Sequence, residues 1–243
     1  MNKVGAVWRR EFRQFWFSPV AYIVICVFLV IASWMFMTGF FIVNNASMDQ
    51  LFGLIPWFFL FLLPALTMRQ WAEEQATGTI ELLMTQPVNE REVVLGKSLA
   101  TVSLLLVILL LTVPLTLTVA GLSQNGLDGG VVFANYLGAF LLGSAYLAIG
   151  GWVSSFTRNQ IIAFILAIGV IFGLIIVGEA MVTIFISKGA SWLVPFLEYI
   201  GLRQHYGSMQ RGVVDTRDLI YYVSVIWLFL YLTTRAVESR KWA

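Results

Sequence analysis

Charge is what this sequence has least of. Only 12% of its 243 residues are charged, whereas 59% are hydrophobic, and the mean hydropathy is +0.85. Soluble globular domains average roughly 25% charged and about 45–50% apolar residues, so a soluble domain is excluded. The net charge of +2 gives no reason to expect a nucleic-acid partner. The composition predicts an all-α integral membrane protein.

Cysteine and histidine are nearly absent as well. The single cysteine, Cys26, lies inside an apolar run, so the chain cannot form an internal disulfide. The single histidine, His205, has no second metal-ligating side chain nearby in the sequence. No Ser/His/Asp or Cys/His set indicates a nucleophile. We therefore expect no metal site and no catalytic residue in this chain.

A complete phosphate-binding loop is also missing. Residues 96–98 read GKS, the end of the pattern G-x-x-x-x-G-K-[ST], but the first glycine of that pattern is replaced by Arg91. Asn89 followed by Glu92 predicts a capping box that starts a helix. The backbone amides of residues 90–97 would then form helix hydrogen bonds and could not bind phosphate. We expect no nucleotide site and no bound cofactor in this chain.

Long apolar runs are abundant. A membrane-spanning helix needs about 20 mostly apolar residues, and six runs are candidates: 20–43, 51–68, 98–121, 133–153, 161–184 and 219–235. Six spans place both termini on one side of the membrane. That side would carry 11 of the 15 Lys and Arg residues, so the positive-inside rule predicts cytoplasmic termini.

Two further segments flank these spans. Residues 1–18 predict an amphipathic helix in the cytoplasmic headgroup plane, with basic residues that either set the topology or bind a partner: Arg9, Arg10 and Arg13. Residues 185–218 are too polar to span the membrane but rich in aromatic side chains. We expect short external or re-entrant helices there.

The charged segment between the second and third spans covers residues 69–97. We expect the second-span helix to continue from Arg69 to Thr77 and to break at Gly78. A second short helix with an exposed apolar patch is expected beyond the break, formed by Thr79, Glu81, Leu82, Leu83 and Pro87. An apolar patch rimmed by charge indicates a docking surface, although a solvated loop explains the composition as well.

This segment resembles the permease subunits of ABC-2-type ATP-binding-cassette transporters. The motif residues that carry the resemblance are Glu73, Glu74, Gly78, Thr79, Glu81, Leu82, Leu83, Pro87, Val94, Leu95, Gly96 and Lys97. The runs FRQFWFSPVAYIV and FLLPALTMR are similar to the gliding-motility branch of these permeases. The resemblance covers about residues 1–105, and beyond them only the pattern of spans agrees.

The resemblance implies a single permease domain over residues 1–243 of a bacterial inner-membrane exporter. It implies a separate ATPase subunit, in two copies, that binds ATP and magnesium. It further implies a second permease, which is either another copy of this chain or a different subunit with an external domain. The residues expected to dock the ATPase are Arg9, Arg10, Arg13, Arg69, Glu73, Glu74, Gly78, Thr79, Glu81, Leu82, Leu83 and Pro87.

Within the predicted spans, Glu179 is the one clear ionisable residue. Intramembrane carboxylates are functional candidates by default, so Glu179 is expected either to act in a gate or on substrate, or to lie at the interface where the fifth span ends. Two pairs have the small-xxx-small spacing of close helix contacts, Gly169 with Gly173 and Ala139 with Gly143. Packing against a second permease and packing within the chain both explain them.

Two other classes of function remain open. A secondary transporter would show an internal repeat and paired discontinuous spans, and the sequence has no convincing repeat. A membrane scaffold or assembly factor without transport fits the composition equally well but leaves the motif of residues 73–97 unexplained. The spans are uniformly apolar and select no substrate.

Overall fold

The computed structural model describes residues 3–43, 48–79, 89–122, 127–179, 192 and 194–239, and all regular structure within them is helical, without a strand. The helices are α1 (Lys3–Phe17), α2 (Pro19–Val43), α3 (Asp49–Thr67), α4 (Ala72–Thr77), α6 (Glu90–Leu122), α7 (Gly129–Ser154), α8 (Gln160–Val177), α10 (Val194–Ile200), α11 (Leu202–Gln210) and α12 (Thr216–Ser239). The predicted all-α fold is confirmed.

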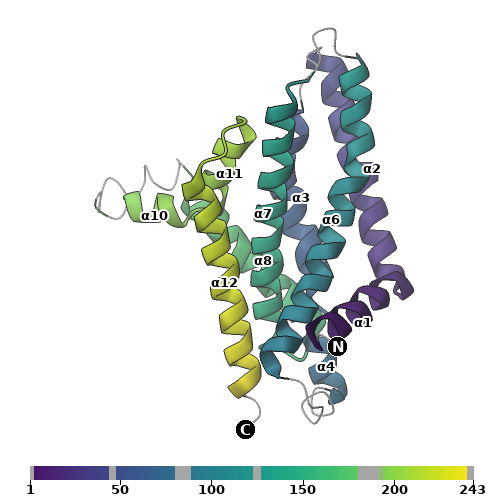
Figure 1. Ribbon diagram of the computed structural model, residues 1–243, viewed down its shortest axis with the longest axis vertical. Coiled ribbons are helices and arrows are strands. Elements are labelled where there is room, and N and C mark those ends of the chain that lie inside the picture. The colour runs from purple at the N-terminus through teal and green to yellow at the C-terminus, as the bar shows by residue number, and fades with distance from the viewer. Residues whose placement is uncertain are drawn as a thin grey trace.

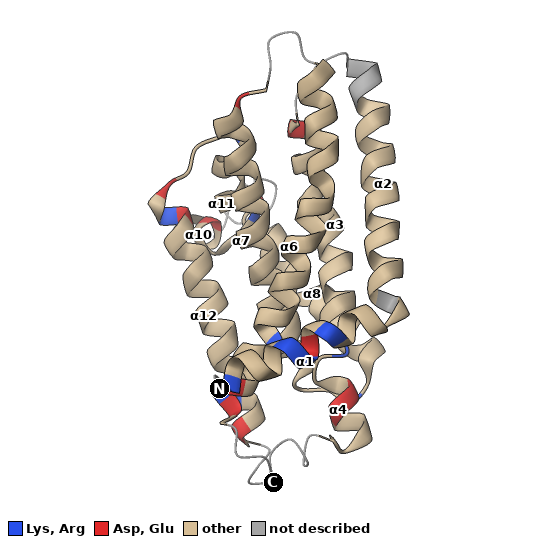
Figure 2. Cartoon of the chain, turned by 45° about the vertical axis from the view of Figure 1, so that its right-hand side comes forward, with Lys and Arg blue, Asp and Glu red and all other residues tan. Residues whose placement is uncertain are grey.

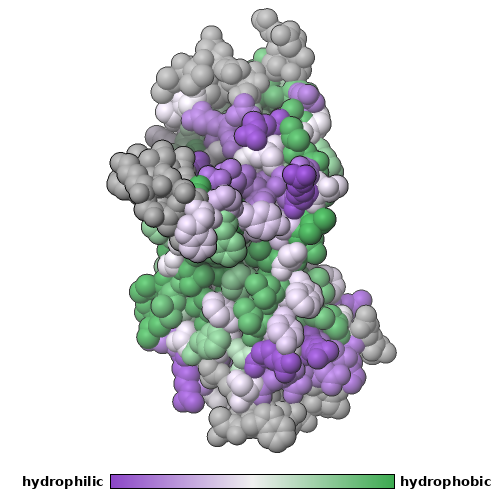
Figure 3. Space-filling model, turned by 90° about the vertical axis from the view of Figure 1, so that its left-hand side faces the viewer, coloured by the Kyte–Doolittle hydropathy of each residue, from purple (hydrophilic) through white to green (hydrophobic). Residues whose placement is uncertain are grey.

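Six of these helices, α2, α3, α6, α7, α8 and α12, are long and apolar enough to cross a membrane. They run along the long axis of the molecule (Figure 1). An apolar belt separates hydrophilic surfaces at the two ends (Figure 3). The chain is thus a multi-pass membrane protein, and the predicted number of spans is confirmed.

The two ends of the bundle differ. α1, α4 and the C-terminal end of α12 lie at one end, which we call the α4 end (Figure 1). Many of the Lys and Arg residues in the described part of the chain gather there, around α1 (Figure 2). Two short helices, α10 and α11, fall within the segment expected to hold them and lie beside α12 away from the α4 end (Figure 1).

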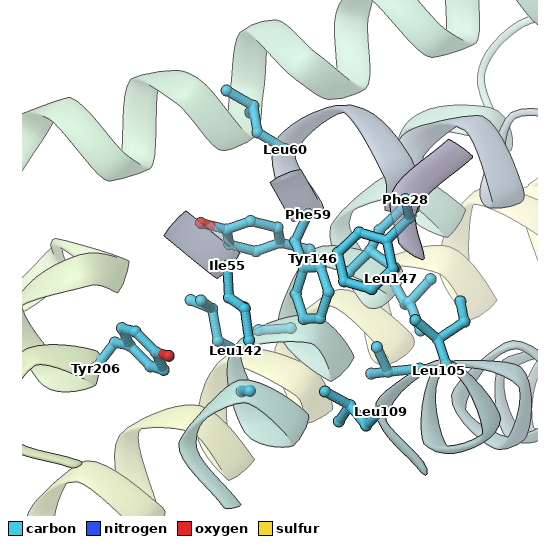
Figure 4. Close-up of a cluster of buried hydrophobic side chains, with 14 of the residues drawn as sticks. Phe28, Ile55, Phe59, Leu60, Leu105, Leu109, Leu142, Tyr146, Leu147 and Tyr206 are labelled. Carbon is cyan, nitrogen blue, oxygen red and sulfur yellow. The ribbon is translucent and has the colours of Figure 1, made fainter. Parts of the chain in front are cut away.

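The core of the bundle is built around α7. In its most apolar stretch 67% of the residues are buried, against 22% in that of α8. Small residues allow this. A Cβ on Gly143 would lie 2.7 Å from Leu105 Cδ2, so α6 and α7 approach closely because a glycine stands between them. Phe59 of α3 and Tyr146 of α7 pack into the same cluster (Figure 4).

The second span continues through Arg69 to Thr77, as expected, but its helix is interrupted. α3 ends at Thr67, residues 68–71 form a turn, and α4 is a separate helix. The hydroxyl of Ser154 accepts hydrogen bonds from the backbone N–H groups of Trp71 and Ala72, both at 3.2 Å, and donates to the Met68 carbonyl at 3.1 Å. A side chain from α7 thus satisfies the backbone groups that the break leaves open.

The fifth span is shorter than predicted, because α8 ends at Val177 and not at residue 184. A Cβ on Gly178 would lie 2.8 Å from the Cα of Gly201, so two backbones cross in contact directly after the helix. Residues 180–184 lie outside the described part of the chain. The helices of the third, fourth and sixth spans, α6, α7 and α12, extend beyond their apolar runs into polar sequence.

The two small-residue pairs have different surroundings. Ala139 is fully buried and Gly143 contacts Leu105 and Phe59, so this pair packs within the chain. An added Cβ on Gly169 or Gly173 would meet nothing within 4 Å among the described residues. The second pair therefore lies on an open face of α8.

Candidate functional site

The N-terminal helix α1 lies across α6 at the α4 end (Figure 1). The two helices meet at Gly96, where an added Cβ would lie 2.6 Å from Val7 Cγ1 and 3.2 Å from the Val4 carbonyl oxygen. The indole N–H of Trp8 donates to Ser103 Oγ at 2.9 Å. The basic residues predicted to dock a partner, Arg9, Arg10 and Arg13, are exposed.

Lys97, on α6 one residue after the crossing point, connects three segments. Its side chain is only 2% exposed. Its ammonium group donates to the Gln70 carbonyl at 3.0 Å and to Glu74 Oε1 at 2.6 Å, and it lies 3.6 Å from Glu11 Oε1. Trp71 covers it, with the ring centroid 5.0 Å from Nζ. One buried cation thus joins α1, the α3–α4 turn, α4 and α6.

α4 is fixed on its other side by the end of α7. Besides the Ser154 bonds, the Gln75 amide nitrogen donates to the Ser155 carbonyl at 2.8 Å. Trp71 also belongs to a small buried cluster that contains Val93 and Val94 of α6. α4 is therefore attached to α6 and α7 together, so a displacement of α4 would act on both spans.

The break predicted at Gly78 is confirmed. Gly78 ends α4 with φ of 71°, the left-handed conformation that favours glycine at a helix C-terminus. Thr79 is exposed, and its hydroxyl lies 2.9 Å from that of Thr77. The remaining residues of the predicted docking helix, Glu81, Leu82, Leu83 and Pro87, lie outside the described part of the chain.

Adjacent glutamates of the motif face opposite directions. Glu73 is exposed, with its side chain 3.9 Å from Arg69, which is exposed as well. Glu74 turns inward to Lys97. Of these three predicted docking residues, Arg69 and Glu73 are exposed and accessible to a partner, whereas Glu74 pairs with the buried Lys97.

The predicted start of the next helix is also confirmed. α6 begins at Glu90, and the Glu92 carboxylate accepts a hydrogen bond from the Asn89 backbone N–H at 3.0 Å. This is one half of a capping box. Residues 90–97 are helical, so Gly96, Lys97 and Ser98 lie within α6 and not in a loop.

Glu179 follows the end of α8 and forms an ion pair with Arg203 of α11. The guanidinium of Arg203 also lies 5.8 Å from the ring centroid of Trp57 in α3. Arg203 of α11 therefore contacts both the segment after α8 and α3. This ion pair gives Glu179 a structural partner that sequence reasoning did not identify.

A polar cluster between α11 and α12 was also missed. His205 Nδ1 lies 2.7 Å from Asp218 Oδ1, and its Nε2 lies 2.9 Å from the Tyr199 carbonyl. Ser208 donates to the other oxygen of Asp218. The His205 ring stacks on Tyr221 at 3.8 Å. Both ring nitrogens are engaged, and among the described residues no group of three metal-ligating side chains occurs.

Sequence comparison identifies the chain's family. Residues 6–237 match the family described as ABC-2 family transporter protein. None of the curated proteins compared with the chain matches it. The family match spans nearly the whole chain, from α1 to the last turn of α12, and extends the resemblance well beyond the motif of residues 73–97.

Proposed function

The chain belongs to the ABC-2 transporter family, and we propose that it is the permease of a bacterial inner-membrane exporter whose ATPase docks at the α4 end. Family membership implies a permease subunit and an ATPase partner. We further propose that transport is outward, that the membrane is the bacterial inner membrane, and that exposed residues at the α4 end dock the ATPase. The observation that carries it is the attachment of α4 to two spans through Lys97 and Ser154.

The proposed docking surface consists of exposed groups at the α4 end. On α1 these are the guanidinium groups of Arg9, Arg10 and Arg13, and on the α3–α4 segment they are Arg69 and Glu73. Thr79 and the apolar residues Leu82 and Leu83 would extend this surface beyond Gly78. Both termini would be cytoplasmic, because Lys and Arg concentrate at this end.

Coupling would run from the ATPase to α4 and from α4 to α6 and α7. When ATP binding closes the ATPase subunits, the docked segment moves. Glu74 and Gln75 are held by α6 and α7, so a rigid shift of α4 displaces these spans. Packed helices switch between discrete arrangements, and a small displacement of α4 can therefore change the state of the bundle.

The full transporter would contain two ATPase subunits and a second permease. That permease is a second copy of this chain, or a different subunit of the gliding-motility branch that carries an external domain. The open face of α8 around Gly169 and Gly173 is available for such a contact among the described residues. The Glu179–Arg203 pair favours a structural role for Glu179 over direct contact with substrate.

Site-specific photo-crosslinking tests the docking surface. A photoreactive residue would replace Arg10 on α1, Glu73 on α4 or Val213, which is 57% exposed in the segment before α12, away from the α4 end. We expect the positions on α1 and α4 to crosslink to the ATPase and position 213 not to. Crosslinks from position 213, or none from the α4 end in a complex that co-purifies, would contradict the proposal.

A further inference from the structure

The junction between α10 and α11, which we call the α10–α11 corner, lies beside α12 (Figure 1). Its backbone carbonyls are bonded by side chains. The hydroxyl of Tyr221 donates to the Ile200 carbonyl at 2.5 Å, and that of Tyr222 donates to the Leu202 carbonyl at 2.7 Å. A third bond comes from the ring of His205. Side chains of α11 and α12 therefore hold the end of α10 in place.

His205 faces an acceptor with each of its ring nitrogens. Nε2 lies 2.9 Å from the Tyr199 carbonyl oxygen, and Nδ1 lies 2.7 Å from Asp218 Oδ1. A carbonyl oxygen has no hydrogen to donate, so the bond to Tyr199 requires a hydrogen on Nε2. The bond to Asp218 requires a second hydrogen, carried by Nδ1 or by the carboxyl group. The pair therefore holds one proton more than a neutral ring and an ionised carboxylate together.

The surroundings of the ring suit this extra proton. The His205 ring stacks on Tyr221 with the centroids 3.8 Å apart, and the Tyr199 ring stands edge-on at 5.4 Å. The face of an aromatic ring attracts a cation. The second oxygen of Asp218 is bonded to the Ser208 hydroxyl. His205 and Asp218 are each only 8% exposed, so each group relies on the partners named here.

Every element packed against α11 was searched for titratable or charged groups near this pair. They are Tyr199 of α10, Tyr146 of α7, Glu179 beyond α8, and the exposed Arg217 with Asp218, Tyr221 and Tyr222 of α12. α3 contacts α11 through backbone carbonyls. Glu179 is paired with Arg203. In the described part of the chain, Asp218 is thus the one carboxylate within ion-pair distance of His205.

We propose that the His205–Asp218 pair is a proton-dependent latch that fixes α10 to α11 and α12. With the proton bound, the ring bridges Asp218 and the Tyr199 carbonyl. After its loss, the ring has a single N–H group and can serve only one of these acceptors. An ionised carboxylate accepts the stronger hydrogen bond, so the bond to Tyr199 breaks and α10 loosens.

The sign of the pH dependence follows from the proton count. The folded cluster binds a proton that a neutral ring and an ionised carboxylate would not bind, so its contribution to stability is present at low pH and is lost as the pH rises. Histidine is the side chain that commonly exchanges a proton near neutral pH. The latch belongs to this chain alone and requires neither the ATPase nor a transported substrate.

Two measurements on the full chain in detergent micelles test the proposal. Because His205 is the single histidine, NMR of isotope-labelled histidine reports on this ring alone, and we expect its signals to change as the pH rises and the pair loses its proton. Spin labels at Phe196 of α10 and Ile220 of α12, both exposed, report the position of α10 in a Cys26→Ser background. We expect a narrow distance distribution below the NMR transition and a broader one above it.

Two variants separate the latch from a merely structural contact. In Asp218→Asn, the amide N–H can donate to Nδ1 while Nε2–H still donates to Tyr199, so a neutral ring satisfies both contacts. We expect this variant to keep the narrow distribution at every pH. Asp215→Asn removes an exposed carboxylate just before α12 and serves as the matched control. We expect it to keep the wild-type pH response.

Three results would overturn the proposal. The first is a His205 ring that keeps one protonation state over the whole pH range in which the protein stays folded. The second is a wild-type distance distribution that is the same on both sides of the NMR transition. The third is an Asp218→Asn variant that keeps the wild-type pH response or is broad at every pH. All readouts concern this chain alone, so these failures are distinguishable from a failure of the proposed permease function.

Discussion

Lys97 is a cation that the fold buries completely. Its charge is balanced by Glu74 at 2.6 Å and by Glu11 at 3.6 Å. A buried ion pair contributes little against a well-packed apolar alternative, but removing one partner leaves the other charge unpaired and is strongly destabilising. Lys97 therefore fixes the geometry of the α4 end, because a movement that separated it from Glu74 and Glu11 would leave buried charges unpaired.

We predict that Lys97→Met lowers the free energy of unfolding by about 3–5 kcal/mol, because Glu74 and Glu11 would remain without a cation. SDS titration in detergent micelles measures this. The double variant Lys97→Met/Glu74→Gln should recover part of the loss. Arg235→Met, which removes an exposed cation of α12, serves as the control. A Lys97→Met protein as stable as the control would refute this role.

Little of this arrangement could be predicted from the sequence. Glu73 and Glu74 are the same residue type at adjacent positions of one sequence motif, yet Glu73 is exposed and Glu74 binds Lys97. The difference comes from the turn at residues 68–71, which is set by a hydroxyl 83 positions further along the chain. One signal was available, since Lys97 directly precedes an apolar run and a charge at such a boundary needs a partner.

At the scale of elements, Ser154 of α7 holds the turn before α4, and Gln75 of α4 adds a second bond to the Ser155 carbonyl. Ser154 is fully buried, accepts from the amides of Trp71 and Ala72, and donates to Met68. Without the hydroxyl, two buried N–H groups would have no acceptor. Helix and turn propensities alone do not predict the break between α3 and α4, because the break depends on a tertiary contact with Ser154 of α7.

We predict that Ser154→Ala lowers the free energy of unfolding by about 1–3 kcal/mol per unpaired buried group and loosens α4. Hydrogen exchange at Trp71 and Ala72, followed by mass spectrometry, measures the local effect. The matched control is Ser155→Ala, since the Ser155 hydroxyl bonds only to Trp152 of its own helix. Equal exchange in the two variants would show that Ser154 does not hold α4.

The existence of the six spans was predictable, and their ends were not. Apolar length alone identifies a span, and all six predicted runs correspond to helices. The ends depend on capping and contact. Asp128 accepts from the Gly130 N–H at 2.9 Å and starts α7 earlier than its apolar run. The approach of Gly201 to Gly178 accompanies the early end of α8.

On the scale of the whole molecule, the two ends have different construction. The α4 end joins α1, α4, α6 and α7 through Lys97 and Ser154. The other end carries the His205–Asp218 cluster and the Glu179–Arg203 pair. Sequence reasoning identified the first end from its motif. It missed the cluster at the second, because His205 and Asp218 are 13 positions apart and meet only when α11 folds back onto α12.

The central claim is that an ATPase works through the α4 end. The most direct test is ATP hydrolysis by the chain purified with its ATPase, comparing wild type with Leu82→Asp/Leu83→Asp. The control is Val213→Asp/Val214→Asp, a second pair of adjacent apolar residues, exposed at the opposite end. We predict that only the first double variant releases the ATPase or uncouples its activity. An associated ATPase whose activity is unchanged by Leu82→Asp/Leu83→Asp would contradict the claim.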